Sequence, residues 1–491
     1  MSSTPENSNS IIQSIPVRFR PQKAEGYQTT VHFDISGDEA TQFTVEVTNG
    51  KCDLLPGLQG APACVVKAKS KHYIALESGE MNPQLAILTG KVKVSNINEM
   101  LRFSKCFIPY HKYNKKPDTT AKKDRKPSSG PLLGYRILDL SRLLPGPWAT
   151  AMLADMGAEV IKIEDPESSD YVRDYPPIID GKSANYMAWN RSKRSTAISL
   201  RTEEGNQQFM KLVETADVVV EQFRPGVIDK WGLGYAEAKK VNPKIIYVSL
   251  TGFGQTGPMA QTAGHDLNYL ALSGVLSLNK DGQGKPVIPG TQLADIASGT
   301  YQTIQAVMAA LLSRHQTGEG QQVDVSMTDG LLPFATIAFN TLWSGQKPEN
   351  QEMVLSGGLP NYNVYRTADD KWVALGALEP KFWSIFCDMV NRPEWKEKAL
   401  PNHPDADQTK KEVVELFQSK TRAAWEELGS KHDICLTPVL ELDEVEQHPH
   451  FLSREMFDHS SSIPLINQPI KFTGTPSQIQ WQAPELGEDE V

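Results

Sequence analysis

Two side chains, His265 and Asp295, stand out as candidates for moving a proton. His265 precedes Asp266 in the glycine-rich stretch GFGQTGPMAQTAGHD, and Asp295 lies in QLADIASG, directly before an expected helix over 296–314. The pKa of an imidazole lies near neutral pH, so a histidine can serve as base or acid with a carboxylate as its partner. The pair therefore suggests proton transfer at one site. Each residue also has a plainer explanation, because lone histidines are often exposed or structural and an aspartate before a helix is often its N-cap.

Four basic residues are candidates for binding phosphate groups. Arg191, Lys193 and Arg194 stand together in NRSKRS, a loop that enters the strand TAISL, and Arg142 follows the strand RILDL. Guanidinium groups make paired hydrogen bonds to phosphoryl oxygens, and an ammonium group adds a point charge. A solvated basic turn and a surface arginine are the alternatives that the sequence leaves open.

The elements that must position these residues are those of a parallel α/β sheet. Short β-branched runs at 136–140, 159–164, 217–221 and 245–250 alternate with helical stretches such as 147–156 and 203–215. Such alternation predicts parallel strands joined by helical crossovers, and open sheets of this kind bind ligands at the carboxyl ends of their strands. From residue 357 onward, short strands and amphipathic helices predict a second, smaller α+β lobe.

The first hundred residues have a different pattern. Apolar and polar residues alternate in VHFDISGDEATQFTVEV, and Asn49-Gly50 is a strong hairpin signal. Short helices are expected over 73–78 and 83–89, and a leading helix over 11–19. The lysine-rich segment HKYNKKPDTTAKKDRKPSSG then predicts an extended linker, with binding to an anionic surface or to nucleic acid as the alternative.

Composition excludes several classes of protein. The 491 residues predict roughly two to four globular units, and a net charge of −9 argues against a chain built as a whole to bind nucleic acid. Five cysteines without a C-x-x-C pair argue against a disulfide framework or a zinc site. With no signal peptide and no apolar run long enough to span a membrane, a soluble cytoplasmic protein is expected. Nucleotide, dinucleotide, serine-hydrolase and zincin signatures are missing.

The stretches VHFDISGDEATQFTVEVTNGKC and YIALESGEMNPQLAILTGKVKVSN resemble the sterol carrier protein 2 (SCP2) family over about 11–107. The resemblance implies a twisted sheet covered by helices around an apolar tunnel for acyl chains or sterols. Its candidate lining residues are Phe33, Phe43, Met81, Leu85, Ile87 and Leu88. Apolar residues at these spacings can equally fill an ordinary core.

The region from 131 to about 477 resembles the family III CoA-transferases (CaiB/BaiF), through LDLSRLLPGPWATAMLADMGAEVIKIEDP, NRSKRS, VVEQFRPGVIDKWGLGY, AGHDLNYLALSG and GALEPKFW. Within them it resembles the alpha-methylacyl-CoA racemases, because His265 stands beside Asp266. The resemblance implies that His265 and Asp295 act on opposite faces of C2 of an acyl-CoA, with Asp266 and Glu379 as supporting carboxylates.

The same resemblance implies a CoA-phosphate region at Arg142, Arg191, Lys193 and Arg194. It also implies no metal or redox cofactor, since CoA belongs to the substrate, and an interlocked homodimer in which Glu379 acts across subunits. Amide groups at the start of the 296–314 helix are expected to stabilise the enolate, and small residues at 297–299 to let a ligand approach.

Two alternatives to a racemase remain. In a CoA-transferase, Asp295 would be a nucleophile and His265 incidental; in a non-catalytic carrier, the α/β region would bind acyl-CoA without turnover. Thr291, Asn361 and Asn363 depart from the racemase pattern, so acyl specificity does not transfer.

The sequence as a whole predicts the following division: a flexible N-terminus (1–10), an SCP2-like lipid-binding domain (11–110), a basic linker (111–130), a catalytic α/β domain (131–350), a small α+β domain (351–450) and a C-terminal segment returning to the large domain (451–491).

Overall fold

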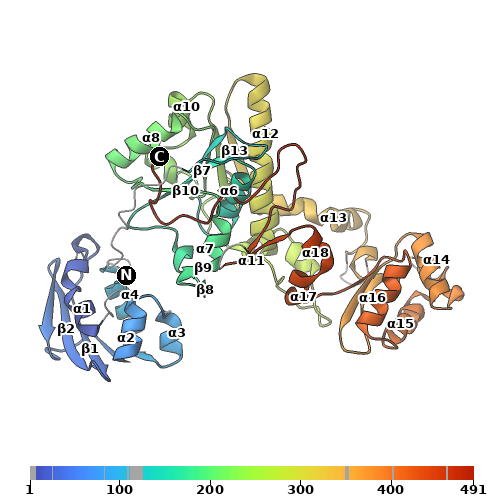
Figure 1. Cartoon of the computed structure of the whole chain (residues 1–491), viewed down its shortest axis with the longest axis horizontal. Helices are drawn as coiled ribbons and strands as arrows, with labels where there is room; N and C mark the ends of the chain where they lie inside the picture. Colours follow the sequence, from blue (N-terminus) through green and yellow to red (C-terminus); the bar gives the residue numbers. More distant parts are fainter. Residues whose placement is uncertain are drawn as a thin grey trace. The chain divides into compact units, whose positions relative to one another are not determined.

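The computed structural model describes residues 7–24, 26–81, 83–107, 110, 125–348, 353–400, 403–459 and 463–491, except the side chains of Gln22, Gln84, Leu85 and Leu88. The chain divides into two compact units, Met1–Lys122 and Lys123–Val491 (Figure 1). Most of the expected basic linker, 111–124, lies outside the described residues. Within the described ranges, no helix is long and apolar enough to cross a bilayer.

The N-terminal unit contains a five-stranded sheet in the order β3-β2-β1-β4-β5. Its strands are β1 (Thr29–Ser36), β2 (Thr41–Thr48), β3 (Lys51–Pro56), β4 (Cys64–Lys69) and β5 (Val92–Val94), and its helices are α1 (Ser8–Gln13), α2 (Ser70–Glu77), α3 (Pro83–Leu88) and α4 (Ile97–Lys105). Strands β1, β2 and β3 form the expected antiparallel meander. Asn49 and Gly50 both have positive φ, which confirms the hairpin prediction. The leading helix, expected to reach residue 19, ends at Gln13. Pro16 has no N–H with which to continue the helical hydrogen bonds, and it begins a separate 3₁₀ turn, Pro16–Arg18.

Aromatic side chains fill the core of this unit. The rings of Phe33 and Phe43 stack with centroids 4.6 Å apart, and Tyr73 meets Phe33 edge-on at 6.3 Å. Met81 packs against the same core, whereas the side chains of Leu85 and Leu88 lie outside the described part. Two of the expected tunnel residues therefore pack on each other, and the tunnel stays a prediction.

The second unit is built on a six-stranded parallel sheet in the order β10-β7-β6-β11-β12-β13. Its strands are β6 (Arg136–Asp139), β7 (Glu159–Glu164), β10 (Arg194–Ala197), β11 (Val218–Glu221), β12 (Ile246–Thr251) and β13 (Gln322–Ser326). The four predicted strands are confirmed, as are the helices α6 (Pro145–Asp155) and α8 (Glu203–Val213). The chain runs from β6 to one edge and then returns to β11, so the order reverses between β6 and β11. Ligands bind such sheets at this switch point, outside the carboxyl ends of the strands.

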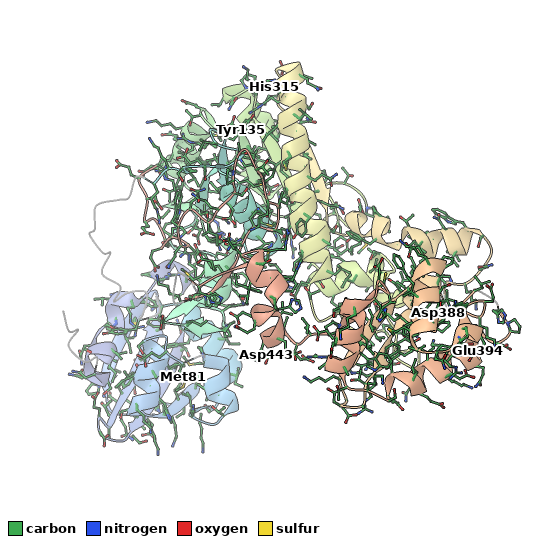
Figure 2. The ribbon with its side chains drawn as sticks, turned by 45° about the vertical axis from the view of Figure 1, so that its right-hand side comes forward. Met81, Tyr135, His315, Asp388, Glu394 and Asp443 are labelled. Atoms are coloured by element: carbon green, nitrogen blue, oxygen red, sulfur yellow. The ribbon has the colours of Figure 1, made fainter. Side chains whose placement is uncertain are left out.

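A smaller lobe follows, with an antiparallel sheet of β14 (Tyr362–Arg366), β15 (Trp372–Gly376) and β16 (Leu436–Pro438). Helices α14 (Pro380–Met389), α15 (Ala406–Phe417) and α16 (Arg422–Lys431) complete it, and Asp388 and Glu394 mark it in Figure 2. Phe386, Trp395 and Trp425 are fully buried in its core. This is the α+β lobe that the pattern after residue 357 predicts.

The C-terminal tail packs along the edge strand β10 and the residues before β6. Arg125 makes a paired hydrogen bond to Asp489 at 2.9 and 2.7 Å. Asp489, fully buried, in turn exchanges hydrogen bonds with the backbone of Ser195 at 2.8 and 3.0 Å. The indole of Trp481 donates to the carbonyl of Lys193 at 2.7 Å. We call this arrangement of residues 125–129, 192–195 and 478–490 the clasp.

Candidate active site

His265 lies where a glycine-rich loop ends and a helix begins. The loop leaves the carboxyl end of β12, and His265 is the N-cap residue of α11 (Asp266–Leu272). The main-chain N–H of His265 donates to Oδ1 of Asn268 at 3.1 Å, which fixes the first turn. The side chain of His265 is exposed, so the fold delivers a histidine to the sheet edge at which ligands are expected.

Asp266 ties this helix to the element that carries Asp295. Its Oδ1 accepts hydrogen bonds from the main-chain N–H groups of Ala294 at 2.7 Å and of Asp295 at 3.0 Å. These are first-turn groups of η5 (Ala294–Thr300), a π-helical segment that continues into α12 (Tyr301–Thr317). Such segments are frequent at functional sites. The carboxylate of Asp266, the residue after His265, thus joins the start of α11 to the segment that carries Asp295.

This arrangement corrects two expectations. The helix starts at Ala294 rather than Ile296, so Asp295 lies inside its first turn and is not the N-cap; Asp266 fills that role from another element. The amides expected to stabilise an enolate are also occupied, because Asp266 holds those of Ala294 and Asp295 and the N–H of Ile296 donates to the carbonyl of Gln292 at 2.9 Å. In this conformation those amides are not available to an enolate oxygen.

The small residues after Asp295 serve helix packing rather than an open ligand approach. A Cβ on Gly299 would stand 2.7 Å from the Cβ of Pro145 in α6, and the hydroxyl of Thr300 donates to the Pro145 carbonyl at 2.9 Å. Ser298, fully buried, donates to the carbonyl of Met327 at 2.6 Å. The segment bearing Asp295 is therefore held rigidly against α6 and the end of β13.

Burial and like charge make Asp295 a weak acid. Desolvation, with a further contribution from the negative charge of Asp266, raises the pKa of Asp295 to about 7. Burial also raises the pKa of Asp266, against the opposing effect of the two amide hydrogen bonds that it accepts. A carboxyl group with a pKa near 7 is present in both protonation states at neutral pH, which is what a proton-transfer group requires.

Glu379 lies in the small lobe, at the N-cap of α14, and is exposed. Its charge contributes, after burial, to raising the pKa of the Cys435 thiol, so these two residues are neighbours. Among the residues that the structure describes, Glu379 makes no hydrogen bond or ion pair with His265 or Asp295. The single chain does not bring this carboxylate together with the other three.

The cations of NRSKRS occupy buried ion pairs. Lys193 is fully buried and donates to Asp139 at 2.8 Å, and Arg191 binds Asp155 at 2.8 Å. Arg194 is the first residue of β10 and pairs with Glu159. Burial opposes ionisation of Asp139, but the ammonium groups of Lys193 and Lys162 outweigh it and hold the pKa of Asp139 well below its usual range. These ion pairs favour a structural role for Arg191, Lys193 and Arg194. Their contact with the CoA phosphates stays a prediction.

Arg142 is placed differently. It follows β6, is half-buried, and donates to the carbonyl of Ser168 at 2.9 Å. The neighbouring loops meet tightly at the switch point, where a Cβ on Gly146 would stand 2.8 Å from Oε1 of Gln222. That oxygen is buried and has no hydrogen-bond partner within the described part of the chain. A buried acceptor without a partner costs free energy, and this one lies at the switch point where open sheets bind ligands.

Sequence reasoning missed Glu221, the last residue of β11 at the same switch point. It is 2% exposed, and burial raises its pKa to about 7 against hydrogen bonds from Ser249 and from the N–H of Phe223. The signal was available, because a carboxylate closes the apolar run DVVVE at the carboxyl end of a strand.

Two of the residues that depart from the racemase pattern have structural partners. Asn361 donates to the carbonyl of Ala377, and Asn363 to that of Gly357, both at 2.9 Å.

Comparison with known proteins agrees with this architecture. Residues 132–490 match the family model described as CoA-transferase family III, and residues 12–107 match that of the SCP-2 sterol transfer family. Human alpha-methylacyl-CoA racemase is 36% identical over 334 residues, which cover 66% of this chain and 82% of that protein. Succinate–glutarate CoA-transferase of Agrobacterium fabrum is 35% identical over 402 residues, covering 75% of this chain and 95% of that protein.

A crystal structure of a CAIB/BAIF family protein from Brucella suis matches with a TM-score of 0.65 and 29% identity, over 74% of this chain and 97% of that one. The match covers almost the whole of the solved protein, and the family model covers most of this chain. The chain therefore belongs to CoA-transferase family III and carries an SCP2 domain at its N-terminus.

Proposed function

We propose that the protein epimerises 2-methyl-branched acyl-CoA thioesters at C2. The observation that carries this proposal is the linkage of His265 to Asp295 through Asp266, together with a pKa of about 7 for Asp295. The 36% identity to a protein named alpha-methylacyl-CoA racemase supports it. In this reaction CoA is part of the substrate, and the chain's own groups move the proton.

The reaction needs two groups with opposite protonation states. One removes the proton at C2, which the thioester acidifies, and the other returns a proton to the opposite face. The pKa of Asp295 lies at about 7, and the element that follows His265 contacts the element that carries Asp295. Either can therefore start as the base, depending on which epimer is bound.

Solvent deuterium tests this proposal. Incubating a (2R)-2-methylacyl-CoA with the protein in D2O is expected to give both epimers with deuterium at C2. The experiment uses short, long and steroidal acyl chains in parallel. Failure to incorporate deuterium into any of them would refute an epimerase.

A CoA-transferase is the second candidate, because relatives named CoA-transferases are 35% identical to this chain. The Asp295 carboxylate would then attack the thioester carbonyl and expel the CoA thiolate, which leaves a mixed anhydride. The thiolate would next attack the aspartyl carbonyl of the anhydride, forming an aspartyl thioester and releasing the carboxylate of the first substrate. Hydroxylamine or borohydride traps an activated acyl-aspartate, which an epimerase does not accumulate. A trapped adduct at Asp295, with His265→Ala still active, would select this alternative.

We place the CoA moiety at the switch point between β6 and β11, beside Arg142. Two observations support this position: the half-buried guanidinium, and Oε1 of Gln222, which has no hydrogen-bond partner among the residues that the structure describes. Replacing Arg142 by glutamine is expected to raise the KM for acyl-CoA while kcat changes little, because a phosphate contact binds ground state and transition state alike.

A homodimer completes the proposed site. The segment after β13 exposes large apolar side chains, among them Phe334 at 56% and Trp343 at 75%. Large apolar side chains that are left exposed together mark candidate interaction sites. A second copy is the proposed occupant, with Glu379 reaching the site of the partner subunit, and sedimentation equilibrium measures the association directly.

For the N-terminal unit we propose binding of fatty-acyl or sterol ligands, supported by its match to the SCP-2 sterol transfer family. Saturable displacement of a fluorescent fatty acid from the full chain would support it, and no displacement would contradict it. The five cysteines are all free thiols, which is compatible with the cytoplasm as the proposed compartment.

Replacing Asp266 by asparagine separates its charge from its hydrogen bonds. The asparagine oxygen still accepts from Ala294 and Asp295, but the like charge beside Asp295 is gone, so the pKa of Asp295 falls. When Asp295 is the base, kcat/KM rises with pH through that pKa. We therefore expect Asp266→Asn to shift the rising limb to lower pH.

The matched control is Asp266→Ala, which removes both charge and cap. It should lower activity at every pH and cost about 1 kcal/mol of stability, as the loss of an N-cap does. An unshifted limb in Asp266→Asn would contradict the electrostatic role.

A further inference from the structure

The peptide bond between Gly264 and His265 is held from both sides by the first turn of α11. Its carbonyl, on Gly264, accepts a hydrogen bond from the phenol of Tyr269 at 2.6 Å. Its N–H, on His265, donates to Oδ1 of Asn268 at 3.1 Å. The next carbonyl, that of His265, accepts from the N–H of Asn268 at 2.8 Å. The orientation of this peptide plane, and hence of the histidine after it, is fixed by two side chains.

The ring of Tyr269 is itself fixed. It is 6% exposed and meets the ring of Phe253 edge-on, with centroids 5.2 Å apart. A Cβ on Gly252 would stand 2.4 Å from Cε1 of Tyr269, and a Cβ on Gly264 would stand 2.7 Å from the same atom. The two glycines thus leave the space that the ring occupies, and any side chain there would push the phenol away from its acceptor.

The same ring lies near both aspartates. After burial, the charges of Asp295 and Asp266 contribute to raising the pKa of Tyr269 to about 12, so the phenol stays protonated and remains a donor throughout the working pH range. Tyr269 lies in α11, which contacts the segment η5 that carries Asp295, and its phenol is bonded to the loop that presents His265. It is therefore placed to set one relative to the other.

We propose that Tyr269 and Asn268 are positioning residues, which hold the Gly264–His265 peptide so that the imidazole faces C2 of the substrate from the side opposite to Asp295. This inference rests on the proposed epimerase function and names residues that serve it. Neither residue is proposed to touch the reacting atoms. Their effect is on geometry, and a misplacement of about 1 Å at a reacting group can cost up to about a hundredfold in rate.

The test uses the full-length protein with the variants Tyr269→Phe and Asn268→Ala. Tyr269→Phe keeps the ring and removes the donor, and we expect kcat for epimerisation to fall about tenfold while KM changes less than about twofold. Asn268→Ala should act in the same direction. Asn268→Asp keeps an acceptor oxygen for the N–H of His265 and should restore most of the rate.

Tyr247→Phe is the matched control. Tyr247 is also buried, at 1% exposed against 6% for Tyr269. Its phenol likewise donates to a main-chain carbonyl, that of Leu233 at 2.9 Å, but it lies in β12 outside the site. The two phenylalanine variants lose the same kind of bond, so a general loss of stability would affect both alike.

Two readouts separate positioning from stability. Misplacing His265 should lower inversion at C2 more than deuterium exchange with retention, because Asp295 can still remove and return a proton on its own face. Amide hydrogen exchange at residues 264–268 should also accelerate in Tyr269→Phe and Asn268→Ala, and stay unchanged in Tyr247→Phe.

The outcomes distinguish the two proposals. If the unmodified protein inverts its substrate but Tyr269→Phe matches Tyr247→Phe, the positioning role is overturned and the epimerase stands. Faster amide exchange with an unchanged ratio of inversion to retention overturns it as well. Absence of any exchange at C2 in the unmodified protein overturns the epimerase and, with it, this inference.

Discussion

Replacing His265 by glutamine is expected to lower epimerisation by about a thousandfold, since loss of a general acid–base group costs 10²- to 10⁴-fold. Asp295→Asn should have an effect of the same size, because inversion needs a group on each face. The two variants should differ in what they retain. Each keeps deuterium exchange with retention for the epimer served by its remaining group, so the two residual activities should belong to opposite epimers.

The matched control for this experiment is His315→Gln. His315 is an exposed histidine in the last turn of α12, at the far end of the helix that follows Asp295 (Figure 2). We expect wild-type rates from it. Deuterium incorporation resolved by chiral chromatography measures all three variants, and residual exchange of the same epimer in both site variants would argue against two groups on opposite faces.

Replacing Lys193 by methionine is expected to lower the free energy of unfolding by about 3–5 kcal/mol, because it leaves the buried carboxylate of Asp139 without its nearest counter-ion. The ammonium group also donates to the Pro147 carbonyl and to Oδ1 of Asn190, each at 2.8 Å, and both acceptors would lose a partner. Urea denaturation at pH 7 measures the change.

Lys240→Met is the comparison variant, since Lys240 pairs with Glu237 on the surface and is 68% exposed. Its loss should cost less than about 1 kcal/mol. The experiment also decides between the two roles considered for NRSKRS. Unchanged stability combined with a raised KM for acyl-CoA would restore the phosphate-binding prediction for Lys193.

The strands of the α/β unit were predictable because each is a short β-branched run that carries its own signal. The run DVVVE needs no distant partner to be read as β11, and the hairpin at Asn49-Gly50 follows from turn geometry alone. The burial of NRSKRS was not predictable in this way. Its partners Asp139 and Asp155 lie 54 and 36 residues earlier in the chain, so only the folded sheet brings the charges together.

In the candidate site, too, some features have a local sequence signal and others depend on contacts between distant residues. His265 and Asp295 could be singled out by residue type and surrounding motif, but the role of Asp266 depends on a contact across 28 residues to the N–H of Ala294. The position of Asp295 within a π-helical first turn likewise depends on that contact. From the local sequence alone, Asp295 would be assigned as the N-cap of the helix that follows it. In the fold, the carboxylate that accepts from the first amides of that helix belongs to Asp266, on another element.

The clasp has a consequence for self-association. Strand β10 is the outermost strand of the sheet, and an uncovered strand edge offers its main-chain groups to another molecule. Here the N–H and carbonyl of Ser195 are already engaged by Asp489. A chain shortened before Asp489 would bare that edge, and light scattering should then detect sheet-to-sheet aggregation. The last residues of the tail are thus expected to keep this strand edge from pairing with another molecule, independently of any chemistry at the carboxyl ends of the strands.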